Sequence, residues 1–97
     1  MVFIVGPRQV GKTWLAKKIM NEYKNPVYLN YDNNDHREII KKQSWLPDVD
    51  LIVFDEIHKM PKWKNYLKGV YDTKAEITHI LVTGSARMDA FKKVGDS

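Results

Sequence analysis

The sequence GPRQVGKT, residues 6–13, constrains the fold of this chain more than any other stretch. It has the pattern G-x-x-x-x-G-K-[ST], and it follows the apolar run from Val2 to Val5. In such a loop the glycines let backbone N–H groups turn toward an anion at the start of a helix. We therefore expect a buried strand, a phosphate-binding loop and a helix, in this order.

The residues of this loop have expected roles toward a nucleoside triphosphate. The Lys12 ammonium can reach the β and γ phosphates, and the Thr13 hydroxyl can bind Mg²⁺. Backbone N–H groups supply further contacts to the phosphates. The residues predicted to bind the nucleotide are Gly6, Pro7, Arg8, Gln9, Val10, Gly11, Lys12, Thr13 and Trp14.

Strands and helices are predicted to alternate along the rest of the chain. Asp35 and Glu38 have the spacing of a capping box, which predicts a helix start, and Pro61 is well placed at the start of another helix. Alternation of this kind predicts a mostly parallel sheet covered by helices on both faces, the three-layer α/β/α fold of P-loop proteins. Apolar patterning predicts strands within 2–5, 26–32, 50–56 and 78–87, and helices within 14–23, 35–42, 61–74 and 88–94.

Polar side chains end the third and fourth predicted strands. Asp55 stands where a carboxylate can hold Mg²⁺ through water, and Glu56 can orient the water that attacks the γ-phosphate. The hydroxyl of Thr83 or of Ser85 can contact that water or the γ-phosphate, and the sequence does not choose between the two. Because the carboxyl ends of parallel strands meet at one edge, all of these side chains are expected around one ligand.

Other conspicuous side chains have ordinary structural explanations. His58 lacks nearby nitrogen or sulfur ligands, so we interpret it as a solvated loop residue. Arg8 and Arg87 could approach phosphate or a neighbouring subunit, although surface ion pairing is favoured for both. The lysines near the third helix are interpreted as a solvated face. The tryptophans fall at packing positions of the pattern and are predicted to lie in the core, with stacking of one of them on a base as the less favoured alternative: Trp14, Trp45 and Trp63.

Composition limits the remaining classes of protein. A chain of 97 residues suits one domain, predicted to span residues 1–97. The absence of cysteine excludes disulfides and thiolate metal sites, and a net charge of +4 is too mild to require a nucleic-acid partner. No apolar run approaches the roughly 20 residues that span a bilayer, so we expect a cytoplasmic protein without a membrane partner.

Three segments taken together, GPRQVGKT, LIVFDEIHKMPKW and ILVTGSAR, resemble the nucleotide-binding core of AAA-type P-loop ATPases. The chain is most similar to a bacterial and archaeal group that pairs this core with an uncharacterised C-terminal domain. The resemblance implies ATP and Mg²⁺ as ligands and a sheet in the strand order 5-1-4-3-2. It places Lys12 and Thr13 in Walker A, Asp55 and Glu56 in Walker B, and Thr83 or Ser85 at the sensor position.

The chain also departs from this family. The family core has residues before the first strand, a fifth strand, an arginine supplied across a subunit interface, and usually a lid. We therefore expect a truncated core, incomplete at its C-terminal end, whose exposed first strand favours self-association.

Three functions remain open from the sequence. Mg²⁺-dependent ATP hydrolysis is favoured, because the three segments converge on one edge of the predicted sheet. The alternative is a nucleotide-gated switch that acts on a protein or DNA partner with little hydrolysis of its own. A small-molecule phosphotransferase is less favoured, because the Asp-Glu pair suits water activation.

Overall fold

A four-stranded parallel sheet forms the middle of the molecule. The computed structural model describes the backbone of residues 2–5 and 10–84 and the side chains of residues 14–84. The strands lie in the order β1-β4-β3-β2, which is the 1-4-3-2 part of the order that the family resemblance implies. The strands are β1 (Val2–Val5), β2 (Pro26–Asn30), β3 (Leu51–Asp55) and β4 (His79–Gly84).

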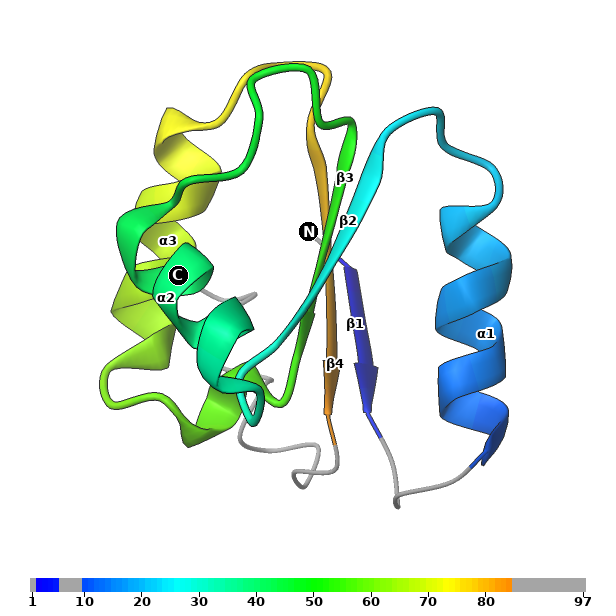
Figure 1. The fold of residues 1–97 in the computed structure, drawn as a ribbon, viewed down its shortest axis with the longest axis horizontal. Coiled ribbons are helices and arrows are strands. Elements are labelled where there is room, and N and C mark those ends of the chain that lie inside the picture. The colour runs from blue at the N-terminus through cyan, green and yellow to red at the C-terminus, as the bar shows by residue number, and fades with distance from the viewer. Residues whose placement is uncertain (1, 6–9, 85–97) are drawn as a thin grey trace.

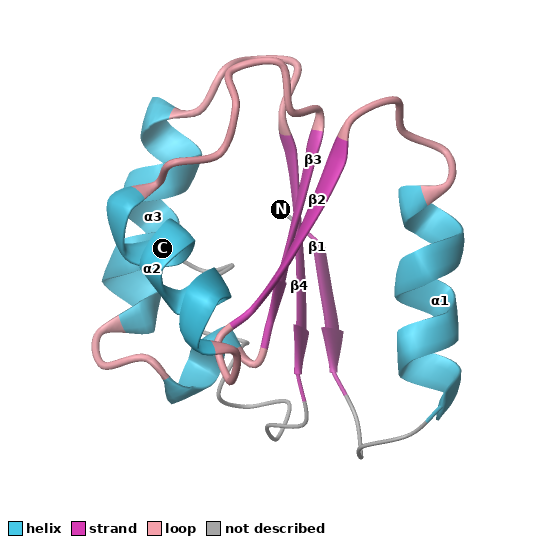
Figure 2. Cartoon of the chain, viewed as in Figure 1, coloured by secondary structure: helices cyan, strands magenta, loops and turns pink. Residues whose placement is uncertain are grey.

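Helices cover both faces of this sheet. Figure 1 shows α1 (Val10–Met20) on one face, with α2 (Asn34–Lys42) and α3 (Trp63–Thr73) together on the other. The three layers are equally clear when the chain is coloured by secondary structure (Figure 2). The predicted α/β/α architecture with a parallel sheet is therefore confirmed.

The central strand β3 is buried on both faces, as its apolar run predicts. On one face Ile52 and Phe54 belong to the larger core cluster, which packs beneath α2 and α3. On the other face Leu51 and Val53 pack with Ala16 of α1. Full burial of each such aliphatic or aromatic side chain contributes about 1.5–3 kcal/mol. Packing on both sides therefore fixes the position of the polar residue that ends this strand.

Helix α2 begins one residue before the predicted capping box, which was therefore assigned to the wrong residues. The cap is Asn33, whose extended backbone (φ −91°, ψ 125°) precedes the helix. Its side-chain oxygen accepts a hydrogen bond from the His36 N–H at 3.0 Å. The predicted cap, Asp35, lies inside the first turn. Its negative charge interacts favourably with the helix dipole there, but the residue does not cap the helix.

Helix α3 also starts later than the proline suggests. It begins at Trp63, because Lys62 has a left-handed backbone (φ 59°) that does not continue a helix from Pro61. On the inner side of α3 the Tyr66 hydroxyl donates to the Ile40 carbonyl oxygen at 2.5 Å. Burial raises the pKa of Tyr66, so this donor stays protonated and joins α3 to α2.

The prediction that all three tryptophans lie in the core is wrong for Trp14. Its side chain is 60% exposed, and the Lys18 ammonium lies 4.9 Å from a ring centroid. At about 100° per residue, Trp14 stands about 200° around the helix from Ala16, which faces the sheet. Trp45 and Trp63 do pack against the core, and the Trp45 ring meets Phe54 edge to face at 6.0 Å.

Several predictions lie outside the described residues. These are the side chains of residues 6–13, which include Lys12 and Thr13, the second hydroxyl candidate Ser85, Arg87, and the last predicted helix. Within the described part, no helix combines the length and the apolar character that crossing a membrane requires.

Candidate functional site

The polar ends of the strands and the start of α1 lie at the same edge of the sheet. All described strands run parallel, so their carboxyl ends share one edge, and α1 begins beside that edge (Figure 1). The backbone of Lys12 and Thr13 belongs to the first turn of α1. Asp55, the last residue of β3, stands in register with Thr83 of β4. The structure thus brings the start of the first helix and the acidic strand end to one place.

The Asp55 carboxylate accepts hydrogen bonds from the two strands that flank it. The Thr83 hydroxyl of β4 donates to Oδ1 at 2.9 Å, and the Tyr28 hydroxyl of β2 donates to Oδ2. Thr83 is 2% exposed, so its hydroxyl is buried against the carboxylate rather than hydrated. Tyr28 packs against the apolar cluster that contains Ala16 of α1. The carboxylate is therefore held on the α1 side of the sheet, toward the helix that follows the predicted phosphate loop.

Tyr28 was not predicted as a site residue. Burial, and then the hydrogen bond to Asp55, raise its pKa above the ordinary range, so the phenol remains a donor near neutral pH. Alternation along β2 does place Tyr28 and Asn30 on one face and Val27 and Leu29 on the other. This signal locates Tyr28 beside Asp55 only when β2 is known to be the neighbour of β3.

The backbone turns away from the direction of β3 at Glu56, and this residue is buried. Its backbone is left-handed (φ 59°), a conformation that costs a non-glycine residue on the order of 1 kcal/mol. The Glu56 N–H donates to the Thr83 carbonyl oxygen at 3.0 Å, which continues the pairing of β3 with β4 past the strand end. Only 6% of Glu56 is exposed. The second acid of the pair therefore occupies a fixed position one residue beyond Asp55.

The Glu56 carboxylate lies near two basic side chains of the short 3₁₀ helix η1 (Ile57–Lys59). Its Oε2 is 3.5 Å from His58 Nε2 and 3.5 Å from Lys59 Nζ. Lys59 in turn forms an ion pair with Asp32 at 2.9 Å. The hydrogen bond to Asp32, together with the charge of Glu56, raises the pKa of Lys59. A chain of alternating charges thus runs from the buried glutamate to the surface.

The interpretation of His58 as a solvated loop residue is wrong. Its side chain is 18% exposed and faces Glu56. The error arose because the tight turn that begins at Glu56 folds the following residues back over the strand end, and sequence spacing does not reveal this turn.

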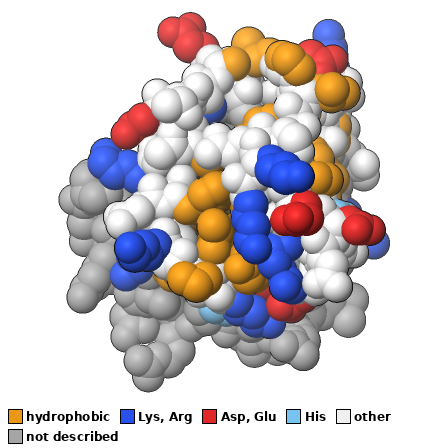
Figure 3. Space-filling view, turned by 60° about the vertical axis from the view of Figure 1, so that its left-hand side comes forward, with side chains coloured by type: hydrophobic (Ala, Val, Ile, Leu, Met, Phe, Trp, Pro, Cys, Tyr) orange, Lys and Arg blue, Asp and Glu red, His pale blue; other side chains and the backbone are white. Residues whose placement is uncertain are grey.

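The lysines near α3 mostly have partners on the molecule. Lys68 pairs with Asp72 at 3.5 Å, while Lys64 and Lys74 lie over the rings of Trp63 and Tyr71. Figure 3 shows Lys and Arg side chains beside hydrophobic ones on the face that α2 and α3 cover. This arrangement agrees with a solvated face made of amphipathic side chains.

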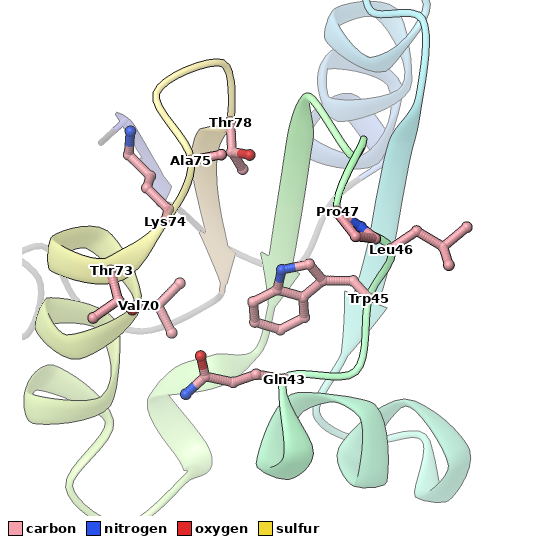
Figure 4. A pocket seen from close by; sticks show the side chains of 9 residues that line it. All are labelled: Gln43, Trp45, Leu46, Pro47, Val70, Thr73, Lys74, Ala75 and Thr78. Atoms are coloured by element: carbon pink, nitrogen blue, oxygen red, sulfur yellow. The ribbon is translucent and has the colours of Figure 1, made fainter.

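A pocket of about 250 Å³ lies at the opposite, amino edge of the sheet. It is formed by the connections from α2 to β3 and from α3 to β4, with Trp45 and Val70 approaching it from opposite sides (Figure 4). Its described lining includes one charged side chain, Lys74, and no acidic one. The sequence did not predict this pocket, which lies away from Asp55 and Thr83.

The described side chains at the carboxyl edge suit a hard cation. A half-buried carboxylate, Asp55, stands beside a hydroxyl, Thr83, and Mg²⁺ prefers oxygen donors of this kind. Among the described residues, no group of three or more His, Cys, Asp or Glu side chains is arranged so that it could hold a metal ion. Mg²⁺ usually needs only one or two carboxylates, because it keeps several water ligands. The residues present therefore fit Mg²⁺ bound mainly through water.

A family model described as "AAA domain" matches residues 1–97. A comparison with curated proteins gave no match.

Proposed function

The chain belongs to the AAA domain family, and on this premise we propose that it binds ATP with Mg²⁺ at the carboxyl edge of the sheet and hydrolyses the bond between the β and γ phosphates to give ADP and phosphate. The observation that carries this proposal is the position of the Asp55 carboxylate. It lies at the end of β3, hydrogen-bonded to Thr83, on the face covered by α1. The first turn of this helix contains Lys12 and Thr13, the two residues that the loop motif pairs with an acidic strand end.

The proposed roles follow from the chemistry of each group. Backbone N–H groups of residues 6 and 8–13 and the Lys12 ammonium offset the charge of the phosphates, while Thr13 and Asp55 hold Mg²⁺. Bound Mg²⁺ stabilises the charge that develops on the transferred phosphoryl group. Glu56 orients the attacking water, and the hydroxyl of Thr83 or Ser85 contacts the γ-phosphate. Residues 1–97 then act as one nucleotide-binding domain.

Replacement of Glu56 tests the hydrolytic role. In the intact protein Glu56→Gln should leave the Kd for ATP within about twofold of wild type and lower kcat by at least about 100-fold, because the amide cannot act as a base. Calorimetry gives the Kd, and phosphate release gives kcat. Lys12→Ala is the matched control, which should lose ATP binding itself. Unchanged turnover in Glu56→Gln would remove this residue from the proposed role.

A nucleotide-gated switch is the second candidate, and the surroundings of Glu56 favour it. Its carboxylate is 3.5 Å from both His58 and Lys59, which compete with a water molecule for the same oxygen. Such a protein would bind ATP and change its affinity for a protein or DNA partner while hydrolysing slowly. Turnover measured at several protein concentrations, with and without candidate partners, separates the two functions. Negligible turnover throughout, with tight ATP binding, would favour the switch.

A further inference from the structure

Tyr28 holds the side of the Asp55 carboxylate that Thr83 does not reach. Because β3 lies between β2 and β4, the two hydroxyls approach Asp55 from opposite neighbouring strands. Thr83 donates to Oδ1 and Tyr28 donates to Oδ2. A carboxylate that accepts one hydrogen bond at each oxygen has a defined plane. Both donors come from strands of the sheet, β2 and β4.

Several contacts fix the Tyr28 ring in turn. The ring lies edge to face with His36 of α2, with 6.2 Å between centroids. His36 Nδ1 accepts a hydrogen bond from the Asn30 N–H at 3.1 Å, and Asn30 Nδ2 donates to the Tyr28 hydroxyl at 3.4 Å. The other side of the ring packs toward the cluster under α1. The hydroxyl is therefore placed by β2 and α2 before any ligand binds.

We infer that Tyr28 is a positioning residue for the metal ion, which keeps the Asp55 carboxylate oriented to accept hydrogen bonds from water bound to Mg²⁺. This inference rests on the proposed function and adds a residue that the loop and acidic-pair motifs do not contain. Each carboxylate oxygen has two lone-pair sites, and the bond from Tyr28 takes up only one of those at Oδ2. Without the Tyr28 hydroxyl, the carboxylate loses a restraint at Oδ2, and its terminal torsion is broad. The entropy lost when Mg²⁺ binding orders the Asp55 carboxylate would then weaken Mg²⁺ binding.

The test separates the effect of Mg²⁺ from the binding of the nucleotide. Calorimetry on the intact protein gives the Kd for ATP in Mg²⁺ and in EDTA. We define the Mg²⁺ enhancement as the Kd in EDTA divided by the Kd in Mg²⁺. In Tyr28→Phe the Kd in EDTA should equal that of wild type, because the phosphate loop is unaltered. The Mg²⁺ enhancement should fall about tenfold. Removal of a side chain that hydrogen-bonds a metal ligand typically weakens metal binding about 10- to 100-fold, and we expect the lower value here.

Two control variants make the result specific. Tyr31→Phe removes a hydroxyl just after the end of the same strand, from a ring that packs against the other core cluster, and should keep the full enhancement. In an Asp55→Asn background, Tyr28→Phe should have no further effect on the enhancement, because its partner is already altered. Urea unfolding of every variant monitors the fold.

The outcomes distinguish this inference from the proposed function. An unchanged enhancement in Tyr28→Phe overturns the inference and leaves the proposed function standing. An equal loss of affinity in Mg²⁺ and in EDTA, or unfolding of the variant without denaturant, also overturns it, because the hydroxyl would then have a structural role. A wild-type protein that binds no ATP, or binds it without any effect of Mg²⁺, contradicts the proposed function and with it the inference.

Discussion

Two buried threonines lie at opposite ends of β4, and the hydrogen bonds of their hydroxyls can be compared. Thr83 donates to the Asp55 carboxylate at the carboxyl edge. Thr78, which precedes the strand, donates to the Val49 carbonyl oxygen at 2.8 Å at the amino edge. Both residues are almost completely buried, so each hydroxyl removed leaves an acceptor with one donor fewer. Only Thr83 lies at the proposed site.

Replacement of these threonines by valine therefore separates stability from function. Thr83→Val and Thr78→Val should each lower the free energy of unfolding by about 1 kcal/mol, because valine keeps the shape and loses the hydrogen bond. Urea denaturation measures this loss. Only Thr83→Val should slow ATP hydrolysis in the intact protein. If both variants hydrolyse ATP at the wild-type rate, the hydroxyl of the proposed sensor must belong to Ser85.

At this scale the sequence predicted site residues from their position in a motif. Asp55 and Thr83 were predicted because each lies at the carboxyl end of an apolar strand, Asp55 as the last residue of β3 and Thr83 as the last but one of β4. Tyr28 was missed because its contact with Asp55 depends on which strands are neighbours, and the patterning of β2 alone does not contain this information. His58 was misjudged because its burial depends on the left-handed turn at Glu56.

The start of α2 is a further feature that the pattern located only approximately. Asn33 caps the helix through its side-chain oxygen, whereas Asp35 stands within the first turn. Both residues belong to the same short polar stretch, and capping is decided by the backbone angles of one residue. Element type is thus predictable from apolar spacing, as it was for α2, while the exact first residue depends on local geometry.

This correction can be checked by comparing two alanine variants. Asn33→Ala should lower the free energy of unfolding by about 1 kcal/mol, because the His36 N–H loses its acceptor. Asp35→Ala should cost only a few tenths of a kcal/mol, the contribution of a charge near a helix N-terminus. Chemical denaturation of the two variants gives both values. A larger loss in Asp35→Ala would restore the predicted capping box.

On the scale of the whole molecule, the two edges of the sheet differ in chemistry. The carboxyl edge holds the acidic pair and the start of α1. The amino edge holds the pocket around Trp45 and Thr78, whose described lining has no carboxylate. The layered architecture was predictable, because alternating strands and helices have few ways to bury their apolar faces. The pocket was not, because it depends on how two connections pack against each other.

The central claim is that Mg²⁺ and ATP bind at the carboxyl edge, and Mn²⁺ tests it most directly. β3 spans about 17 Å at about 3.3 Å per residue, so a paramagnetic ion at one edge affects the two ends of this strand very differently. The measurement is the broadening of backbone amide signals of the intact protein by Mn²⁺ with ATP. The account predicts strong broadening of Asp55 and Thr83 and little change at Val49 and Thr78. Broadening centred on Trp45 and Thr78, with sharp signals from Asp55 and Thr83, would contradict it.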